Sequence, residues 1–261
     1  MTDQRSHPSP ELPPAREGRR HRPTRGTSVA LALRWAAGRW RWVDPEVAGL
    51  HQVVRPGSVC LDIGAECGVY TWVLASLAGP TGQVYTAEPA DRPDRSLWSV
   101  AISLMLGCGN VVVYSPHAPG LLTGREAAGH SRRRMRQVRC AEDLPRIVPV
   151  IPRVGSTVDA LCRQEGLQKV DFIKANVADA NTDVLMGAFS TLLRDRPALL
   201  LEIEDRQLAT RTLKSTDLVR SLTQSLGYAM YCWSDGNWEP VTRVTADVRN
   251  YLFSRQPFTR D

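Results

Sequence analysis

The sequence predicts an α/β fold, with helices packed on both faces of a mostly parallel sheet. Short apolar segments of strand length alternate with segments of helical periodicity from residue 58 onward, which is typical of this fold class. A glycine turn joins the clearest pair, a buried strand at residues 58–63 and a helix at residues 69–79. Because such alternation produces right-handed crossovers between parallel strands, we expect a doubly wound sheet.

The remaining elements follow in order along the chain. Further strands are expected at residues 84–86, 110–114, 169–177, 197–203, 228–233 and 250–254, which gives a seven-stranded sheet. Helices are expected at residues 96–106, 156–166, 181–194 and 216–226, because apolar residues recur there on one face. Residues 115–148 are interpreted as a loop or insertion with a basic strand, and residues 234–247 as a polar connection.

The N-terminal region divides the chain into three predicted parts. Residues 1–27 are rich in Pro, Arg and Ser, which predicts a disordered basic tail. Residues 28–57 predict a helical cap, and residues 58–261 predict the sheet domain. The tail is interpreted as a solvated leader, although its six arginines up to Gly26 also suit contact with nucleic acid or an acidic membrane.

Composition limits the class of protein. The 261 residues are 43% hydrophobic and carry a net charge of +6, which fits one large domain with extensions. None of the six cysteines is spaced C-x-x-C, and we expect neither a zinc site nor another metal site. There is no signal peptide and no apolar stretch of about 18 residues, so we expect a cytoplasmic protein without a membrane partner.

The turn after the first strand is the strongest functional signal. Asp62, Gly64 and Gly68 form the pattern D-x-G-x-x-x-G, which departs from the G-x-G-x-x-G of dinucleotide-binding folds and agrees with class I methyltransferases. Glu88 follows the next strand, about 20 positions later, where an acidic residue binds ribose hydroxyls. These residues favour S-adenosylmethionine as the ligand. Alternatively, Glu88 caps a helix that starts near Asp91.

Five motifs occur in order and with fitting gaps. They are VDPEVAGLHQVVRPGSVCLDIGAECGVYT from Val43, VYTAEP from Val84, STVDALC from Ser156, VDFIKANVADANTDVLMGA from Val170 and PALLLEIE from Pro197. Together they resemble the FkbM-type S-adenosylmethionine-dependent methyltransferases, from Asp44 to Phe253. The resemblance implies a class I, Rossmann-like fold with S-adenosyl-L-methionine as cofactor, and methyl transfer that is usually to a hydroxyl group.

The resemblance also implies which residues bind the cofactor. They come from the glycine turn and the end of the second strand: Asp62, Gly64, Ala65, Glu66, Gly68, Tyr70, Glu88 and Pro89. The chain departs from the family in two places. Glu66 replaces a usual Asn, and residues 175–179, Ala-Asn-Val-Ala-Asp, replace I-D-V-E-G. Asn176 can orient an acceptor hydroxyl but cannot take its proton, and the change removes a possible ligand for a divalent cation.

Two further side chains are candidate bases for a hydroxyl acceptor. His117 follows the third strand and Asp179 follows the fourth, and a histidine has the more suitable unperturbed pKa. The catalytic candidates are therefore Asn176, His117 and Asp179. Lys174, inside the fourth strand, can form a salt bridge with a carboxylate. Glu202 is either a site carboxylate or a residue that ends its strand.

Three functions follow from these patterns. The favoured one is an O-methyltransferase that acts on a small hydroxylated molecule, a sugar or a secondary metabolite. The second is a catalytically impaired, cofactor-binding partner protein, which Asn176 and Ala178 support. The third is a nucleic-acid methyltransferase, suggested by arginine clusters, but no N-P-P-Y-type motif is present and we expect no nucleic-acid partner. The acceptor and the oligomeric state are left open.

Overall fold

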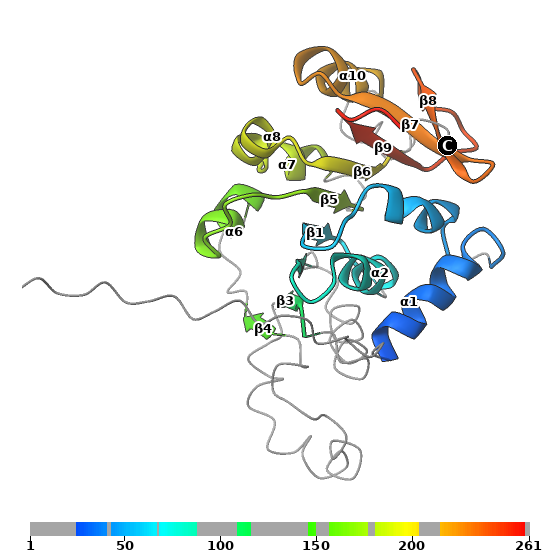
Figure 1. Cartoon of the computed structure of the whole chain (residues 1–261). Helices are drawn as coiled ribbons and strands as arrows, with labels where there is room; N and C mark the ends of the chain where they lie inside the picture. The colour runs from blue at the N-terminus through cyan, green and yellow to red at the C-terminus, as the bar shows by residue number, and fades with distance from the viewer. Residues whose placement is uncertain are drawn as a thin grey trace, which may run out of the picture.

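The fold is a single sheet with helices on both faces. The computed structural model describes residues 25–40, 43–66, 68–87, 109–115, 146–149, 157–176, 181–203 and 215–258. Within these residues, nine strands form one sheet in the order β4-β3-β2-β1-β5-β6-β9-β7-β8 (Figure 1). The predicted α/β class and mostly parallel sheet are confirmed.

The parallel part of the sheet comprises the first six strands. They are β1 (Val59–Ile63), β2 (Gln83–Ala87), β3 (Val111–Ser115), β4 (Arg146–Pro149), β5 (Phe172–Ala175) and β6 (Ala198–Glu202). Three antiparallel strands continue the sheet from β6: β9 (Asn250–Ser254), β7 (Ala229–Ser234) and β8 (Asn237–Val241). The carboxyl ends of β1, β2, β5 and β6 therefore meet at one edge, where ligands bind in open sheets.

The described sheet has two strands more than the seven expected from the sequence, so that number is wrong. Residues 234–247 are not only a connection, because Asn237–Val241 pairs with β7 as β8. Asp235 and Gly236 have φ values of 51° and 83°, and an Asp-Gly pair is the sequence signal for such a hairpin turn. The other added strand, β4, lies at the opposite edge, at the end of the expected basic segment. Both are edge strands, where the apolar pattern is weak.

The helices divide into two groups (Figure 1). One face of the sheet is covered by α1 (Arg25–Ala36), the 3-10 helix η1 (Pro45–Gln52) and α2 (Val69–Ala78). The other is covered by α6 (Val158–Gln164), α7 (Asn181–Met186), α8 (Phe189–Asp195), and α10 (Ser215–Arg220) with its continuation η6 (Ser221–Ser225). Successive strand residues alternate between the faces, so Cys60 packs under α2 and Leu61 packs on the opposite side.

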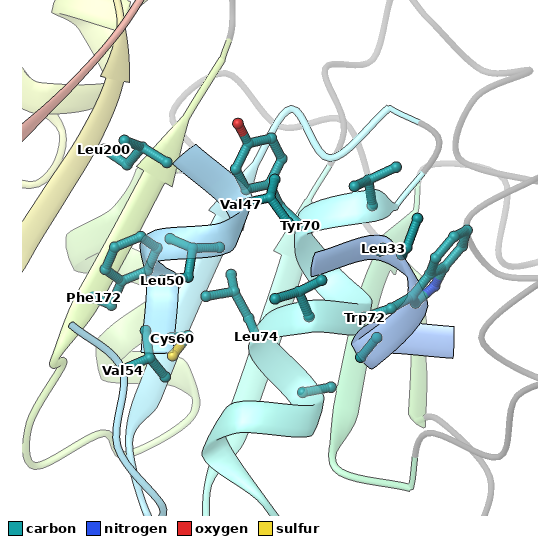
Figure 2. Packing of buried hydrophobic residues seen from close by; sticks show 14 of the residues in the cluster. Leu33, Val47, Leu50, Val54, Cys60, Tyr70, Trp72, Leu74, Phe172 and Leu200 are labelled. Atoms are coloured by element: carbon teal, nitrogen blue, oxygen red, sulfur yellow. The ribbon is translucent and has the colours of Figure 1, made fainter. Parts of the chain in front are cut away.

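The N-terminal helices pack both against α2, which follows them in the sequence, and against the C-terminal strands β7 and β8. Leu33 of α1 and Leu50 of η1 join the cluster of buried side chains on α2 and the strands (Figure 2). Gly49 lies against the Trp233 ring, where a Cβ atom would come within 2.2 Å of the ring, and its carbonyl accepts a hydrogen bond from Trp238 Nε1. Helices thus exist where a cap is expected, although α1 starts at Arg25. The division into tail, cap and domain stays a prediction.

None of the described helices is both long enough and apolar enough to span a membrane.

Candidate functional site

The turn between β1 and α2 has an unusual backbone. Gly64, Glu66 and Gly68 have φ values of 74°, 53° and 80°. Glycine adopts this left-handed conformation freely, whereas a residue with a Cβ atom is strained in it. Gly68 is the N-cap of α2, so the turn leads directly into the N-terminus of that helix. A helix N-terminus is a place where acceptor groups of ligands bind.

Backbone hydrogen bonds bring the ends of three strands to this turn. Gly64 N–H donates to the Ala87 carbonyl at the end of β2, over 2.8 Å, and Glu88 is the next residue. Asn176 N–H, just after β5, donates to the Ile63 carbonyl over 2.9 Å. Asn176 is half-buried. The structure thus places Gly64 and Asn176 at the same edge of the sheet, where β1, β2 and β5 end.

The predicted site residues are divided between the described and the remaining parts of the chain. Glu88 and Pro89 of the cofactor set lie outside the described residues, as do the candidate bases His117 and Asp179. Ala65 and Glu66 lie in the turn, with Ala65 buried. Among the described residues, no group of three or more His, Cys, Asp and Glu side chains could hold a metal ion.

Asp62 and Lys174 form a buried ion pair beneath the turn. Asp62 is fully buried, and its Oδ2 accepts a hydrogen bond of 2.6 Å from Thr71 Oγ1. Its Oδ1 lies 3.5 Å from Lys174 Nζ and has no hydrogen-bond partner. Lys174 Nζ donates to the Gly64 carbonyl over 2.9 Å and lies 4.8 Å from the centre of the Tyr70 ring. The predicted salt bridge of Lys174 is confirmed, and its partner is Asp62.

Tyr70 points its hydroxyl group at two carboxylates of the N-terminal segment. The hydroxyl oxygen lies 2.9 Å from Asp44 Oδ2 and 2.6 Å from Glu46 Oε1. Figure 2 shows this hydroxyl directed away from the apolar side chains around the ring. A phenol has one proton to donate, so both contacts are hydrogen bonds only when one carboxyl group carries a proton.

Glu46 is the carboxyl group suited to hold that proton. Burial, with a further contribution from the nearby Asp44 charge, raises the pKa of Glu46 to about 7. Burial and the same two acids raise the pKa of Tyr70 well above its ordinary value. No sequence pattern predicts this cluster, although both acids belong to the D-P-E motif of residues 44–46. Tyr70 as a cofactor contact stays a prediction, and its hydroxyl is engaged by Asp44 and Glu46.

Glu202 has a structural partner. It is buried at the end of β6 and forms an ion pair with Arg249, whose side chain is exposed. This contact agrees with the interpretation of Glu202 as a residue that ends its strand. A direct role in the site has no support from the described contacts.

The comparisons with known proteins point to one family. Residues 62–230 match the model of the methyltransferase FkbM domain. No curated protein matches the chain. Among solved structures, similar ones include a SAM-dependent methyltransferase from Aquifex aeolicus, with 16% identity, TM-score 0.42, and 87% of this chain and 96% of that chain covered.

Two O-methyltransferases are similar at the same level. The one from Thermotoga maritima has 15% identity and TM-score 0.43, with 89% of this chain and 72% of that chain covered. The one from Bacillus cereus, in complex with SAH, has 12% identity and TM-score 0.44, with 87% and 89% covered. These are loose likenesses, so the assignment depends on the family match, which includes the turn, β5 and β6. Because this match spans most of the chain, the protein belongs to the FkbM methyltransferase domain family.

Proposed function

We propose that the protein is an S-adenosyl-L-methionine-dependent O-methyltransferase that acts on a small hydroxylated molecule, a sugar or a secondary metabolite. The observation that carries the proposal is the turn of Gly64, Glu66 and Gly68, at the sheet edge where β1, β2 and β5 end, in a methyltransferase family. The hydroxyl acceptor follows from the usual chemistry of the family that the sequence resembles.

The residues of the turn fit the cofactor. They lead into the N-terminus of α2, where backbone N–H groups suit the carboxylate of a methionine moiety. Glu88, the residue after β2 in the sequence, is the candidate for binding ribose hydroxyls, and Pro89 follows it. The bound cofactor supplies an activated methyl group on a sulfonium centre. Asp62 is fully buried, and its carboxylate contacts Thr71 of α2 and Lys174 of β5.

The chain's own part in the transfer is to orient the acceptor and remove its proton. Asn176 follows β5 beside the turn, and its amide can hold an acceptor hydroxyl by hydrogen bonds. His117 and Asp179 are the candidate bases, because they follow the strands on either side of the predicted site.

Calorimetric titration of the purified protein with S-adenosylmethionine and S-adenosylhomocysteine tests the proposal. We expect micromolar binding of both, and methylation of hydroxylated acceptors by the loaded protein. A well-folded protein that binds neither compound contradicts the cofactor site, and with it the enzyme.

A second candidate function rests on one observation. The residue after β5 is Asn176 where the family has Asp, which favours a catalytically impaired protein that binds the cofactor and serves as a partner. The substitution Asn176→Asp separates the two functions. A strong gain of methyl transfer identifies the wild type as an impaired enzyme, whereas loss of transfer identifies Asn176 as an adapted residue of an active site.

A further inference from the structure

Lys174 is the buried lysine of an arginine-rich chain. The sequence has only the lysines Lys169, Lys174 and Lys214 among 33 basic residues. Lys174 is 3% exposed, in the middle of the sheet, directly opposite Asp62 on the neighbouring strand. Burying an ammonium group costs free energy unless nearby groups compensate its charge. The groups that contact Lys174 Nζ therefore indicate the role of this lysine.

The three contacts of the ammonium group belong to one structural unit. They reach the end of β1 through Asp62, the turn through the Gly64 carbonyl, and α2 through the Tyr70 ring. The hydrogen bond to Gly64 is 2.9 Å, whereas Asp62 Oδ1 lies at 3.5 Å. A lysine placed only to neutralise Asp62 is expected at about 2.7–2.9 Å from the carboxylate. The geometry favours the carbonyl over the carboxylate.

This carbonyl belongs to one of the two glycines of the turn. Gly64 has a φ of 74°, and a glycine backbone has wide conformational freedom. Its N–H donates to the Ala87 carbonyl, and its own carbonyl accepts from Lys174. The N–H and carbonyl groups of Gly64 are thus both hydrogen-bonded to neighbouring strands. These two bonds fix the orientation of the backbone where the turn begins.

We propose that Lys174 is a positioning residue for the cofactor site: through the Gly64 carbonyl, its ammonium group holds the turn of residues 64–68 in the shape that binds the cofactor. Lys174 is too deeply buried to touch the ligand and acts through the backbone. The inference rests on the proposed function for the ligand, while the ordering of the turn is a property of the chain alone.

Hydrogen exchange of the full-length protein, followed by mass spectrometry of peptides, tests the ordering without a ligand. Lys174→Met leaves the buried Asp62 carboxylate without its charge partner and lowers the stability of the whole protein. Amide exchange of a peptide covering residues 62–70 is therefore expected to rise at least tenfold more than exchange of β6 and β9. Lys169→Met is the matched control, because this exposed lysine pairs with Asp171 at the start of the same strand and should leave the turn unchanged. An increase in exchange of the same size in residues 62–70 and in β6 and β9 of Lys174→Met would overturn the proposal.

A second pair of variants separates the carbonyl contact from the charge pair and guards against failure to fold. Asp62→Asn keeps the bond from Lys174 to Gly64, so the turn should lose no more protection than β6 and β9. Asp62→Asn combined with Lys174→Met removes both buried charges, and its turn should exchange fast although the protein is folded. Equal protection in these two proteins would contradict a role of the Gly64 contact.

Titration with S-adenosylmethionine and S-adenosylhomocysteine completes the test. Affinity for both should fall at least tenfold in Lys174→Met and stay at the wild-type value in Lys169→Met. A loosened turn with unchanged affinity overturns the positioning role. If wild type binds neither compound, the proposed function has failed, and the exchange data still decide whether Lys174 orders the turn.

Discussion

The two faces of the sheet bury different kinds of side chain. In the described part of the chain, the face under α1, η1 and α2 holds four buried charged residues, Glu46, Asp62, Lys174 and Glu202. The face under α6, α7, α8 and α10 is filled with aliphatic and aromatic side chains, with hydroxyls such as Thr191 among its buried polar groups. Its buried carboxylate, Asp195, lies at the end of α8 and accepts a hydrogen bond from Val170 N–H. Both faces are built from the same strands, whose residues alternate between them.

The two faces therefore contribute differently to stability and to the site. Apolar burial stabilises the fold without further conditions, whereas a buried charge contributes only when its partners are in place. The charged face is also the one that carries the turn of residues 64–68, whose Gly64 carbonyl is bonded by Lys174. We infer that the apolar face provides stability and that the charged face shapes the site at some cost to stability.

The largest expected effect comes from breaking the buried pair. Asp62→Leu should lower the free energy of unfolding by about 3–5 kcal/mol, because it leaves the Lys174 ammonium group without its charge partner. Adding Lys174→Met should recover most of this loss, since both charges are then removed. On the apolar face, Ile173→Val should cost about 1 kcal/mol. Urea unfolding measures all three, and no recovery in the double variant would show that the two charges are not coupled.

The pH dependence of stability should come from the charged face. Folding raises the pKa of Glu46 from 4.5 to about 7, so the folded state holds this proton more tightly. The stabilisation is complete below pH 4.5 and is lost as the pH rises through about 7. At about 1.4 kcal/mol per pKa unit, the loss is on the order of 3 kcal/mol.

Unfolding of Glu46→Gln across the same pH range checks this assignment. The variant should lose most of the slope, because its amide does not titrate. Asp217→Asn, which alters an exposed ion pair with Arg220, should keep the slope of the wild type. A slope that persists in Glu46→Gln belongs to another group.

Cofactor affinity should depend on the residue that follows β2. Glu88→Ala should weaken binding of S-adenosylmethionine by about 1.5–3 kcal/mol, as expected for lost hydrogen bonds to a charged group. Calorimetry measures the effect, and Asp247→Ala, an exposed acid in the connection before β9, is the control. Unchanged affinity in a folded Glu88→Ala protein removes Glu88 from the site.

The smallest expected effect concerns Glu66, which lies in the turn of residues 64–68. Glu66 has a φ of 53°, which is unfavourable for a residue with a Cβ atom. Glu66→Gly should therefore raise the free energy of unfolding by about 1 kcal/mol. Glu66→Gln keeps the Cβ atom and should not show this gain. An equal result for both variants would mean that side-chain contacts of Glu66 offset the backbone strain.

Local signals allowed the strand, turn and helix of the charged face to be predicted. An apolar run, two glycines and helical spacing lie within one short segment, and β1 and α2 begin and end within a residue of the expected bounds. The backbone then brings Asn176 to the same edge, as the parallel order of β1 and β5 requires.

Tertiary partners carried no comparable signal. Asp44 and Glu46 lie 26 and 24 residues from Tyr70, and no local pattern links them. A carboxylate partner for Lys174 was predictable from its burial in a strand. The Gly64 carbonyl was not, because every residue has a backbone acceptor and its orientation depends on the folded turn.

Because Lys174 also donates a hydrogen bond to the Gly64 carbonyl, the acid and the base of the buried pair are not interchangeable. Asp62 and Lys174 face each other across β1 and β5, and exchanging the two residues would conserve both the net charge and the number of ions. An aspartate at position 174, however, has no proton to donate and would set a negative charge against the carbonyl oxygen of Gly64. The sheet therefore has a polarity across its strands, with the acid required on β1 and the base on β5.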